Sequence, residues 1–501
     1  MSEKVRVDRE MPLLLGLDVG SSGGRAMLFD VQGQPLAHAS QTWSARYPRP
    51  ERAELDAEAI WEATADLMRS VCDRAAPGRI VGVGISSQLT TLFLDAMHVP
   101  VYPVLPWLDR RAEAEARALE AEAGRERLAD VAGRRSAAER PAAIARWMQR
   151  YEAPTWARTA WICTLKDFLV FRLTGRLAAD EPNASYSLLF NVRGRRWDPG
   201  LCSLAGVAAA HLPEVLPSPA VVGPVHRAAM AATGLPAGIP VAAGGPDGTL
   251  AALGAGLTMP AVGVDVAGTT DVVFACLRDP KLDPTGGLVT NVHACPGRWL
   301  LGGPTTTTGG ALAWFAEQVA HETDFSLLTR EAAAVAFGAE GVRCFPALSG
   351  DRTPVWDSRL RAAFFGLGLG HTRAHLVRAI LETTACVVRR VQQAVRELGE
   401  VMQEVRLVGG AAESELWSQI RADVLGLPVR RMLVRDASSL GAAILAAVGA
   451  GLYPDVLTAA KAMSGSGELL QPRSEMRQAA DELYADFERI QGLLQGLWQV
   501  S

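Results

Sequence analysis

One pattern occurs twice in this chain of 501 residues. Residues 13–19, LLLGLDV, form an apolar run that ends in a turn of glycines and serines, and residues 25–31 form a second apolar run. Residues 262–276, VGVDVAGTTDVVFAC, repeat the same order of apolar run, aspartate, small-residue turn and apolar run. Apolar runs of this length predict strands. Each copy therefore predicts a hairpin of two strands, and the repetition predicts two related halves.

The length of the chain favours the same division. A single hydrophobic core stops growing at roughly 250 to 300 residues, so we expect two domains, residues 12–255 and residues 256–500. Residues 80–86 and 404–408 predict further strands. Helical patterns cover residues 112–132, 142–150, 166–173, 247–256, 372–399 and the stretch from Ser474 onward. This alternation of strands and helices predicts an α/β fold.

The composition excludes several classes of protein. Hydrophobic residues make up 49% and charged residues 21%, and a net charge of −4 is spread without blocks, which is typical of a soluble globular chain without a nucleic-acid surface. Residues 1–9 carry charges of both signs, and no stretch stays apolar for the ~18 residues of a membrane span. We therefore expect a cytoplasmic protein with no nucleic-acid or membrane partner, and a homodimer is left open. The seven widely spaced cysteines predict free, mostly buried thiols.

The two turns predict phosphate-binding sites. Neither is a P-loop or a dinucleotide fingerprint, because each joins one strand to another instead of opening a helix. Glycines leave the backbone N–H groups of such a turn open toward an anion. The predicted phosphate-binding residues of a nucleotide are Gly20, Ser21, Ser22, Gly23 and Arg25 in the first turn and Gly268, Thr269 and Thr270 in the second. The alternative is that each turn only ends a hairpin.

Two further features fit a nucleotide. Asp18 ends the first strand and is a predicted Mg²⁺ ligand, because magnesium prefers carboxylate oxygens and retained waters. The alternative role of Asp18 is an Asx-turn.

Residues 409–429 predict a strand, a Gly-Gly turn and a helix. Bare glycines let a flat ligand lie against the backbone, and the acidic first helical turn would repel phosphate, so we expect adenosine there. The predicted adenosine-binding residues are Gly409, Gly410, Ala411 and Ser414; the alternative is a tight turn alone.

Eight segments, in order along nearly the whole chain, resemble the FGGY family of carbohydrate kinases, most closely its xylulokinase branch. They are LGLDVGSSGGRAMLFD, PWLDRRAEAEA, KDFLVFRLTG, GGPDGTLAALG, AGTTDVV, FPALSGDRTPVWD, AAFFGLGLGHTRAHLVRAILE and GGAAESELW. The resemblance implies an actin-like, ribonuclease-H-like fold in each domain and an active site in the cleft between them. It also implies MgATP as the phosphate donor and a small sugar as the acceptor.

The same resemblance assigns roles to single residues. Asp247 falls where the family has its catalytic base, and a carboxylate at the broken end of a strand suits that task, because an attacking hydroxyl must lose its proton. Asp247 is also a predicted metal ligand together with Asp18; its alternative role is a helix N-cap. Trp107, Asp109 and Arg111 match the family's W-x-D-x-R stretch on the sugar side.

One segment departs from the family pattern. Where xylulokinases have Gln-Met-His-Gly, this chain has SSQLTTLFLD, residues 86–95, so Gln88, Leu89 and Thr90 are the predicted substrate residues and the histidine is absent. The predicted reaction is phosphorylation of D-xylulose to D-xylulose 5-phosphate. The alternatives are another ketose or polyol (ribulose, L-xylulose, erythritol or glycerol) or gluconate. A more remote alternative is an actin-like ATPase that does not act on sugar. A sugar-sensing regulator is disfavoured because the sequence has no basic DNA-reading segment.

Overall fold

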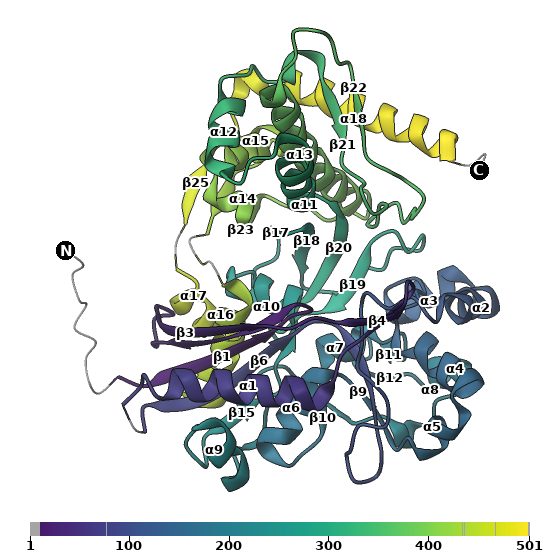
Figure 1. Ribbon diagram of the computed structural model, residues 1–501, viewed down its shortest axis with the longest axis vertical. Helices are drawn as coiled ribbons and strands as arrows, with labels where there is room; N and C mark the ends of the chain where they lie inside the picture. The colour runs from purple at the N-terminus through teal and green to yellow at the C-terminus, as the bar shows by residue number, and fades with distance from the viewer. Residues whose placement is uncertain (1–10, 77, 433, 435, 466, 499–501) are drawn as a thin grey trace. The chain divides into compact units, whose positions relative to one another are not determined.

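The computed structural model describes residues 11–76, 78–432, 434, 436–465 and 467–498 (Figure 1). The chain divides into two compact units. Unit 1 consists of the residues up to Thr258 together with Asn291–Trp299 and Asp436–Gly465, and unit 2 consists of the rest. Both units are therefore discontinuous in sequence, whereas the predicted domains of residues 12–255 and 256–500 are continuous stretches. Residues 1–9, whose charges entered the sequence argument, lie outside the described residues.

The central sheet of unit 1 has the strand order β14-β15-β6-β1-β2-β3, and β16 also pairs with β6. The strands are β1 (Leu13–Val19), β2 (Gly23–Phe29), β3 (Pro35–Thr42), β6 (Ile80–Ser87), β14 (Val221–Pro224), β15 (Pro240–Ala242) and β16 (Gly245–Pro246). β1 is antiparallel to β2 and parallel to β6. The predicted hairpin is confirmed, but β2 begins at Gly23 instead of residue 25, because Gly23 and Gly24 already pair with Thr42 and Gln41 of β3.

The sheet of unit 2 repeats this arrangement. Its order is β19-β20-β18-β17-β23-β24-β25. The strands are β17 (Val262–Ala267), β18 (Thr270–Leu277), β19 (Val289–Val292), β20 (Trp299–Thr307), β23 (Glu404–Gly409), β24 (Val429–Arg431) and β25 (Glu468–Leu470). β17 is antiparallel to β18 and parallel to β23, as β1 is to β2 and β6. The predicted second copy of the hairpin is confirmed, and both units have the α/β architecture.

The predicted helices are present, with one of them divided in two and the last beginning at Arg477 instead of Ser474. Several other helices, among them residues 57–72 and 437–449, were not predicted. In unit 1 they are α1 (Ala57–Cys72), α2 (Glu113–Ala123), α3 (Arg125–Ala132), α4 (Pro141–Tyr151), α5 (Ala153–Arg158), α6 (Leu165–Thr174), α7 (Glu181–Tyr186), α8 (Pro199–Ala205), α9 (Arg227–Thr233), α10 (Asp247–Gly254), α16 (Ala437–Gly449) and α17 (Val456–Met463). In unit 2 they are α11 (Gly309–Trp314), α12 (Phe325–Ala333), α13 (Arg373–Glu397), α14 (Gly410–Glu413), α15 (Glu415–Leu425) and α18 (Arg477–Trp498). Residues 112–132 were predicted as one helix but form two, because Gly124 has a φ of 82° and breaks the helix there.

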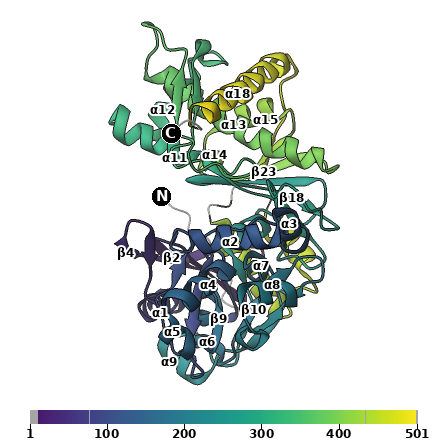
Figure 2. The same ribbon diagram turned by 90° about the vertical axis from the view of Figure 1, so that its right-hand side faces the viewer.

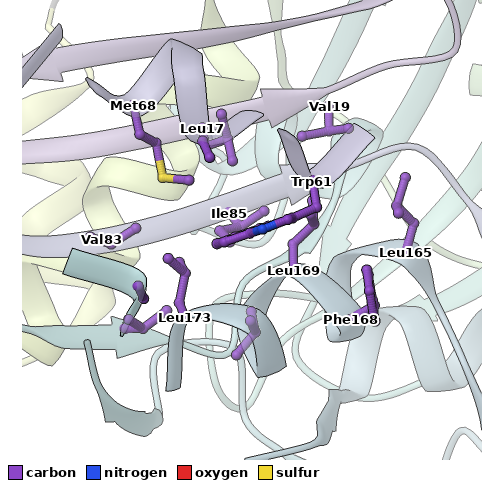
Figure 3. Packing of buried hydrophobic residues seen from close by; sticks show 14 of the residues in the cluster. Leu17, Val19, Trp61, Met68, Val83, Ile85, Leu165, Phe168, Leu169 and Leu173 are labelled. Carbon is purple, nitrogen blue, oxygen red and sulfur yellow. The ribbon is translucent and has the colours of Figure 1, made fainter. Parts of the chain in front are cut away.

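One face of β1 packs on the main core of unit 1. Side chains alternate between the faces of a strand, so Leu13, Leu15, Leu17 and Val19 point to the same side. They join a buried cluster with side chains of α1 and α6, among them Trp61, Met68, Phe168 and Leu173 (Figure 3). This alternation leaves Gly16 and Asp18 on the opposite face of β1.

The opposite face of β1 and β6 is covered by α16 at glycine contacts. A Cβ added at Gly16 would lie 2.0 Å from the Ser439 carbonyl oxygen, and one added at Gly84 would lie 1.9 Å from that of Ala442. Helix α10 meets α16 in the same manner, since a Cβ at Gly254 would lie 2.0 Å from the Ala437 carbonyl oxygen. Glycine residues therefore let the backbones of these elements pack directly on one another, and the C-terminal end of α10 is held against α16.

A second cluster of buried apolar side chains lies under helices α2, α4 and α8, which pack on one another (Figure 2). It includes Leu119, Trp147 and Leu201. A three-stranded sheet of the order β8-β7-β9 borders it, with strands β7 (Thr90–Leu94), β8 (Leu105–Pro106) and β9 (Trp161–Cys163). Unit 1 thus has a second layer, which carries the segment around Trp107.

All seven cysteines are free, and six of them are buried, as expected; Cys72 is partly exposed. Among the described residues, no helix combines the length and the apolar character needed to cross a bilayer.

The glycine contacts of α16 predict a large effect for a small substitution. Gly84→Ala should lower the free energy of unfolding by about 3 kcal/mol, because the new methyl group would displace the backbone of α16. Chemical denaturation measures this loss. Gly492→Ala in α18 is the matched control, since a Cβ there meets no atom within 4 Å, and it should keep or slightly raise stability. A loss below 0.5 kcal/mol for Gly84→Ala would contradict the packing argument.

Candidate active site

The strand register of unit 1 brings two distant aspartates together. Asp18 of β1 pairs with Ser86 of β6 in parallel register, and Ser86 also pairs with Gly245 of β16. Asp247 follows β16 directly as the first residue of α10, with Pro246 as the N-cap. The carboxyl ends of β1, β6 and β16 therefore meet at one edge of the sheet. The Ser438 hydroxyl of α16 donates to the backbone carbonyl of Asp247 at 3.3 Å and holds it there.

Both carboxyl groups at this edge hold their protons unusually tightly. Burial and, to a smaller extent, the negative charge of Asp18 raise the pKa of Asp247 to about 7, although a hydrogen bond from the Gly248 N–H at 2.7 Å acts in the opposite direction. Burial also raises the pKa of Asp18, and the Ser86 hydroxyl, which donates at 2.7 Å, and the Arg25 guanidinium act in the opposite direction. The guanidinium of Arg25 is itself paired with Asp436.

These two carboxylates fit a divalent cation. Their mutual repulsion would be relieved by a positive ion, and Mg²⁺ is commonly held by one or two carboxylates with waters and substrate phosphates completing its shell. Among the described residues, no group of three or more His, Cys, Asp or Glu side chains is arranged as a metal site. Two carboxylate groups supply oxygen ligands, which suit magnesium, whereas zinc sites are built mainly from cysteine and histidine.

A backbone hydrogen bond closes the first turn, and part of the turn is exposed to solvent. The Gly20 N–H donates to the Gly23 carbonyl at 2.8 Å, and the indole N–H of Trp43 donates to the Gly20 carbonyl at 3.3 Å. Ser22 at the tip and Arg25 on β2 are exposed. A Cβ at Gly23 would lie 2.6 Å from the Gln41 carbonyl oxygen, so β3 requires a glycine there independently of any ligand.

Ser21 links this turn to the predicted substrate residues. The indole N–H of Trp107 donates to the Ser21 hydroxyl at 3.1 Å, and Ser21 donates to Oε1 of Gln88 at 2.7 Å. Because the hydroxyl proton of Ser21 is directed at Gln88, the amide group of Gln88 is oriented with its Nε2 away from Ser21. That Nε2 is buried and has no hydrogen-bond partner, and Gln88 is 1% exposed.

The other predicted substrate residues are engaged within unit 1. Asp109 and Arg111 form a fully buried pair with two contacts of 2.8 and 2.9 Å, and Arg111 also donates to Glu54 at 2.9 Å and to the Tyr102 hydroxyl at 3.0 Å. Both carboxylate oxygens of Asp109 also accept backbone N–H groups. With these groups satisfied, the pair fixes the loop that carries Trp107.

The segment that departs from the family pattern is also tied down. The Thr90 hydroxyl accepts the Leu165 N–H at 2.9 Å, and Thr90 is buried. Leu89 is half-buried, and its carbonyl accepts the Trp107 N–H at 3.0 Å. Of the three predicted residues in this segment, Gln88 is the one with a buried polar side-chain atom that has no hydrogen-bond partner.

A buried charge cluster beneath Asp247 was missed by the sequence argument. The ammonium of Lys166 lies 2.6 Å from Asp167 and 2.9 Å from Asp180 and donates to the Ala243 carbonyl at 2.7 Å. All three side chains are at most 1% exposed. Ala243 begins the turn between β15 and β16, so the cluster supports the strand end that places Asp247. The signal was a lysine beside an aspartate within an otherwise apolar helical pattern.

In unit 2 the second turn lies beside the Gly-Gly turn. Gly268 and Thr269 are exposed at the tip between β17 and β18, and the Thr269 carbonyl accepts the N–H groups of Thr308 and Gly310, each at 3.0 Å. Ala267 pairs with Gly409 in parallel register. Residues 305–310, TTTTGG, brace this turn and were not among the predicted site residues.

The predicted adenosine residues form an open backbone corner. Gly409 has a φ of 89°, and a Cβ there would lie 2.3 Å from the Ala267 carbonyl oxygen, so this position requires glycine. At Gly410 a Cβ would meet no atom within 4 Å. Ala411 is buried, and Ser414 caps α15 by accepting the Trp417 N–H at 3.3 Å. Gly410 is thus the residue whose empty side faces away from the packed chain.

The second copy of the strand aspartate has a different environment. Asp265 of β17 corresponds to Asp18 of β1, but it is fully buried, 3.2 Å from Nη1 of Arg421. Arg421 also pairs with Asp271 at 2.7 Å, and Asp271 accepts the Thr308 hydroxyl. Asp265 and Asp271 of unit 2 thus share one buried guanidinium group, whereas Asp18 of unit 1 lies beside Asp247 and is hydrogen-bonded to Ser86.

Comparison with known proteins identifies the class of protein that has this fold. The family model described as the FGGY family of carbohydrate kinases, N-terminal domain, matches residues 13–254, and the C-terminal domain model of the same family matches residues 263–450. The chain belongs to the FGGY family of carbohydrate kinases, and it is an ATP-dependent sugar kinase. The predicted family membership and reaction class are confirmed.

Individual relatives span almost the full chain. A xylulose kinase of Staphylococcus epidermidis is 26% identical over 95% of this chain and 96% of its own length. A glycerol kinase of Geobacter sp. (strain M21) is 31% identical over 98% of this chain and 100% of its own length. Among solved structures, a xylulose kinase from Rhodospirillum rubrum superposes with a TM-score of 0.89 at 28% identity and covers 97% of this chain and 100% of that chain.

The raised pKa of Asp247 predicts that its carboxylate destabilises the fold. Between about pH 4 and pH 7 the folded state binds the Asp247 proton more tightly than the unfolded state, so stability falls as pH rises through this window. Asp247→Asn should therefore raise the free energy of unfolding on the order of 2 kcal/mol at pH 8 and leave it unchanged below about pH 4. Urea denaturation over this pH range measures the difference.

The control is Asp130→Asn, because the Asp130 side chain is 71% exposed, and it should change stability by less than about 0.5 kcal/mol at every pH. An Asp247→Asn variant that is no more stable than the parent at pH 8 would show that the carboxylate is not desolvated.

Proposed function

We propose that Asp247 is the general base of this kinase and that the attacking group is a primary hydroxyl of a small linear sugar. The observation that carries the proposal is a partly buried carboxylate beside Asp18, with a pKa raised to about 7. A base with a pKa near the working pH accepts a proton efficiently while it remains largely ionised. An ordinary aspartate, with a pKa near 4, is a much weaker base.

The proposed step is a direct phosphoryl transfer. The sugar hydroxyl gives its proton to a carboxylate oxygen of Asp247 as its oxygen forms a bond to the γ-phosphorus of ATP. The bond between that phosphorus and the bridging oxygen breaks, and ADP leaves with the electron pair. Little covalent work falls to the protein in such a reaction, so the placement of the acceptor hydroxyl accounts for most of its contribution.

Mg²⁺ is proposed to be held by Asp18 and Asp247, and when bound it would neutralise negative charge on the transferred phosphoryl group. Arg25 and the N–H groups of Gly20, Ser21, Ser22 and Gly23 are proposed to contact phosphate in unit 1. Ser21 has its hydroxyl engaged by Trp107 and Gln88, so its backbone is the proposed contact.

In unit 2, the exposed tip of Gly268 and Thr269 and the hydroxyl of Thr270 are proposed to contact phosphate, and the corner at Gly409, Gly410, Ala411 and Ser414 is proposed to hold adenosine. The register of Ala267 with Gly409 places these two segments side by side, which supports a shared nucleotide. That the turns of both units hold the same nucleotide stays a prediction.

On the sugar side, Gln88 and Trp107 are the proposed contacts, with Leu89 beside them. The unpartnered Nε2 of Gln88 is a donor for a sugar oxygen. Asp109, Arg111 and Thr90 are proposed to act as positioning residues, because their polar groups are satisfied within the protein. Relatives are named xylulose kinase and glycerol kinase, which fits D-xylulose as the first candidate and another ketose, a polyol or gluconate as alternatives.

Two substitutions should give opposite kinetic patterns. Asp247→Asn should lower kcat by roughly 10²- to 10⁴-fold, because it removes the base while keeping its shape, and ATP should still bind. Thr269→Val should instead raise the KM for ATP with a smaller effect on kcat, because it removes a proposed phosphate contact. Coupled ADP release over a panel of D-xylulose, L-xylulose, D- and L-ribulose, erythritol, xylitol, glycerol and gluconate measures both, with calorimetry for ATP binding.

An Asp247→Asn variant that retained most of its kcat with the best acceptor would rule out Asp247 as the base. ADP release that did not depend on any added acceptor would favour a plain ATPase instead.

A further inference from the structure

Two buried arginines in unit 1 stack on one tyrosine. Arg134 follows α3 and Arg140 precedes α4, and their guanidinium carbons lie 5.7 and 4.2 Å from the ring centre of Tyr186. Arg134 is 2% exposed and Arg140 is 4% exposed. Arginine is rarely buried to this extent without a carboxylate that neutralises it.

Among the described residues, no carboxylate lies within hydrogen-bond distance of either guanidinium group. The Arg134 side chain donates a hydrogen bond to the amide oxygen of Asn291, and the Nε atoms of both arginines are buried without a partner. Glu139 forms ion pairs with Arg140 and with Arg110, each at 3.6 Å, which is beyond hydrogen-bond distance. One carboxylate thus faces three guanidinium groups.

The charge is costly in the ligand-free protein. Burial lowers the pKa of Arg134 well below its ordinary value, and the positive charge of Arg140 lowers it further. A buried charge without a hydrogen-bonded counter-ion destabilises a fold. Sites that keep such strain are commonly those that bind a compensating ligand, since function and stability compete there.

The cluster adjoins the proposed substrate residues on two sides. Tyr186 ends α7, and α7 packs on β16, the strand that immediately precedes Asp247. Arg110 belongs to the loop that also carries Trp107, three residues earlier. The two arginines are therefore next to the elements that place both the base and the predicted sugar contact.

We propose that Arg134 and Arg140 bind a carboxylate of the acceptor, so that the substrate is a sugar acid, an aldonate or ketoaldonate, phosphorylated at its far primary hydroxyl. The proposal rests on the proposed function and narrows its substrate class. A linear aldonate has a carboxylate at one end and a primary alcohol at the other, which matches a guanidinium pair at one side and Asp247 at the other. Guanidinium groups bind carboxylates through two parallel hydrogen bonds, and stacking on Tyr186 fixes their planes.

Matched pairs of acceptors test the proposal in the intact enzyme. Gluconate and xylonate are compared with the neutral alditols of equal length, sorbitol and xylitol, and with D-xylulose, by coupled ADP release and by calorimetric binding without ATP. We expect kcat/KM for the better aldonate to exceed that for every neutral acceptor by at least about 10²-fold, because a neutral end leaves the arginines unpaired.

Variants assign the preference to the two arginines. Arg134→Gln and Arg140→Gln should each lower kcat/KM for the aldonate by roughly 10²-fold and change that for a neutral acceptor by less than threefold, and Arg140→Lys should recover part of the loss. Arg135→Gln is the control, because Arg135 is adjacent in sequence but forms an ion pair with Glu120 at 3.7 Å. Arg134→Met should also raise the melting temperature of the ligand-free protein, since it removes an unpaired buried charge.

The outcomes separate this proposal from the proposed function. A neutral sugar that leads the panel, with equal losses for both substrate classes in the arginine variants, would overturn the carboxylate site and leave the kinase assignment intact. A fall in melting temperature with Arg134→Met, with no aldonate preference, would assign the arginines a structural role and overturn the proposal as well. Aldonate binding that is lost in the arginine variants, without phosphorylation of any acceptor, would support the carboxylate site and count against the proposed function.

Discussion

The parallel pairing of β6 with both β1 and β16 is the constraint on which the proposed site depends. This register places Asp18, Ser86 and the residue after β16 at one edge of the sheet, although Asp18 and Asp247 are far apart in sequence. Helix α16 packs directly on Gly16 and Gly84, and its Ser438 holds the backbone of Asp247 at this edge. The buried Lys166 cluster supports the same strand end from beneath. Packing, and not a flexible loop, therefore fixes the two carboxylates.

The two units show how one hairpin pattern acquires two roles. Each has an aspartate at the same position of its first strand, but the surroundings decide its chemistry. In unit 2 the guanidinium of Arg421 neutralises Asp265 and Asp271, which makes that aspartate part of the framework. In unit 1 the neighbour of Asp18 is the carboxyl group of Asp247, whose pKa the charge of Asp18 raises, and the pair suits a metal ion and a proton acceptor. The two units share the strand pairing of the backbone. They differ in the buried guanidinium of Arg421, which pairs with the aspartates of unit 2.

Much of this could be predicted from the sequence, since strands and turns are set by local patterns. The run LLLGLDV and its repeat predicted both hairpins. The Gly-Gly turn was also predicted, and Gly409 in it has a backbone conformation that requires glycine. Features set by tertiary contacts were not predictable in the same manner. Nothing near Asp109 in the sequence indicates that its carboxylate is saturated by Arg111 and two backbone N–H groups. The pairing of Arg134 with Tyr186 likewise joins segments that no periodicity connects. The roles of all predicted site residues stay predictions.

The account depends most directly on the proton affinity of Asp247. Infrared difference spectroscopy of the ligand-free enzyme against Asp247→Asn, recorded over a pH series, isolates the carboxyl band of this residue. The account predicts a titration midpoint near 7 that moves to lower pH in Asp18→Asn, because the neighbouring negative charge is then removed. A midpoint near 4 that does not change in Asp18→Asn would contradict it.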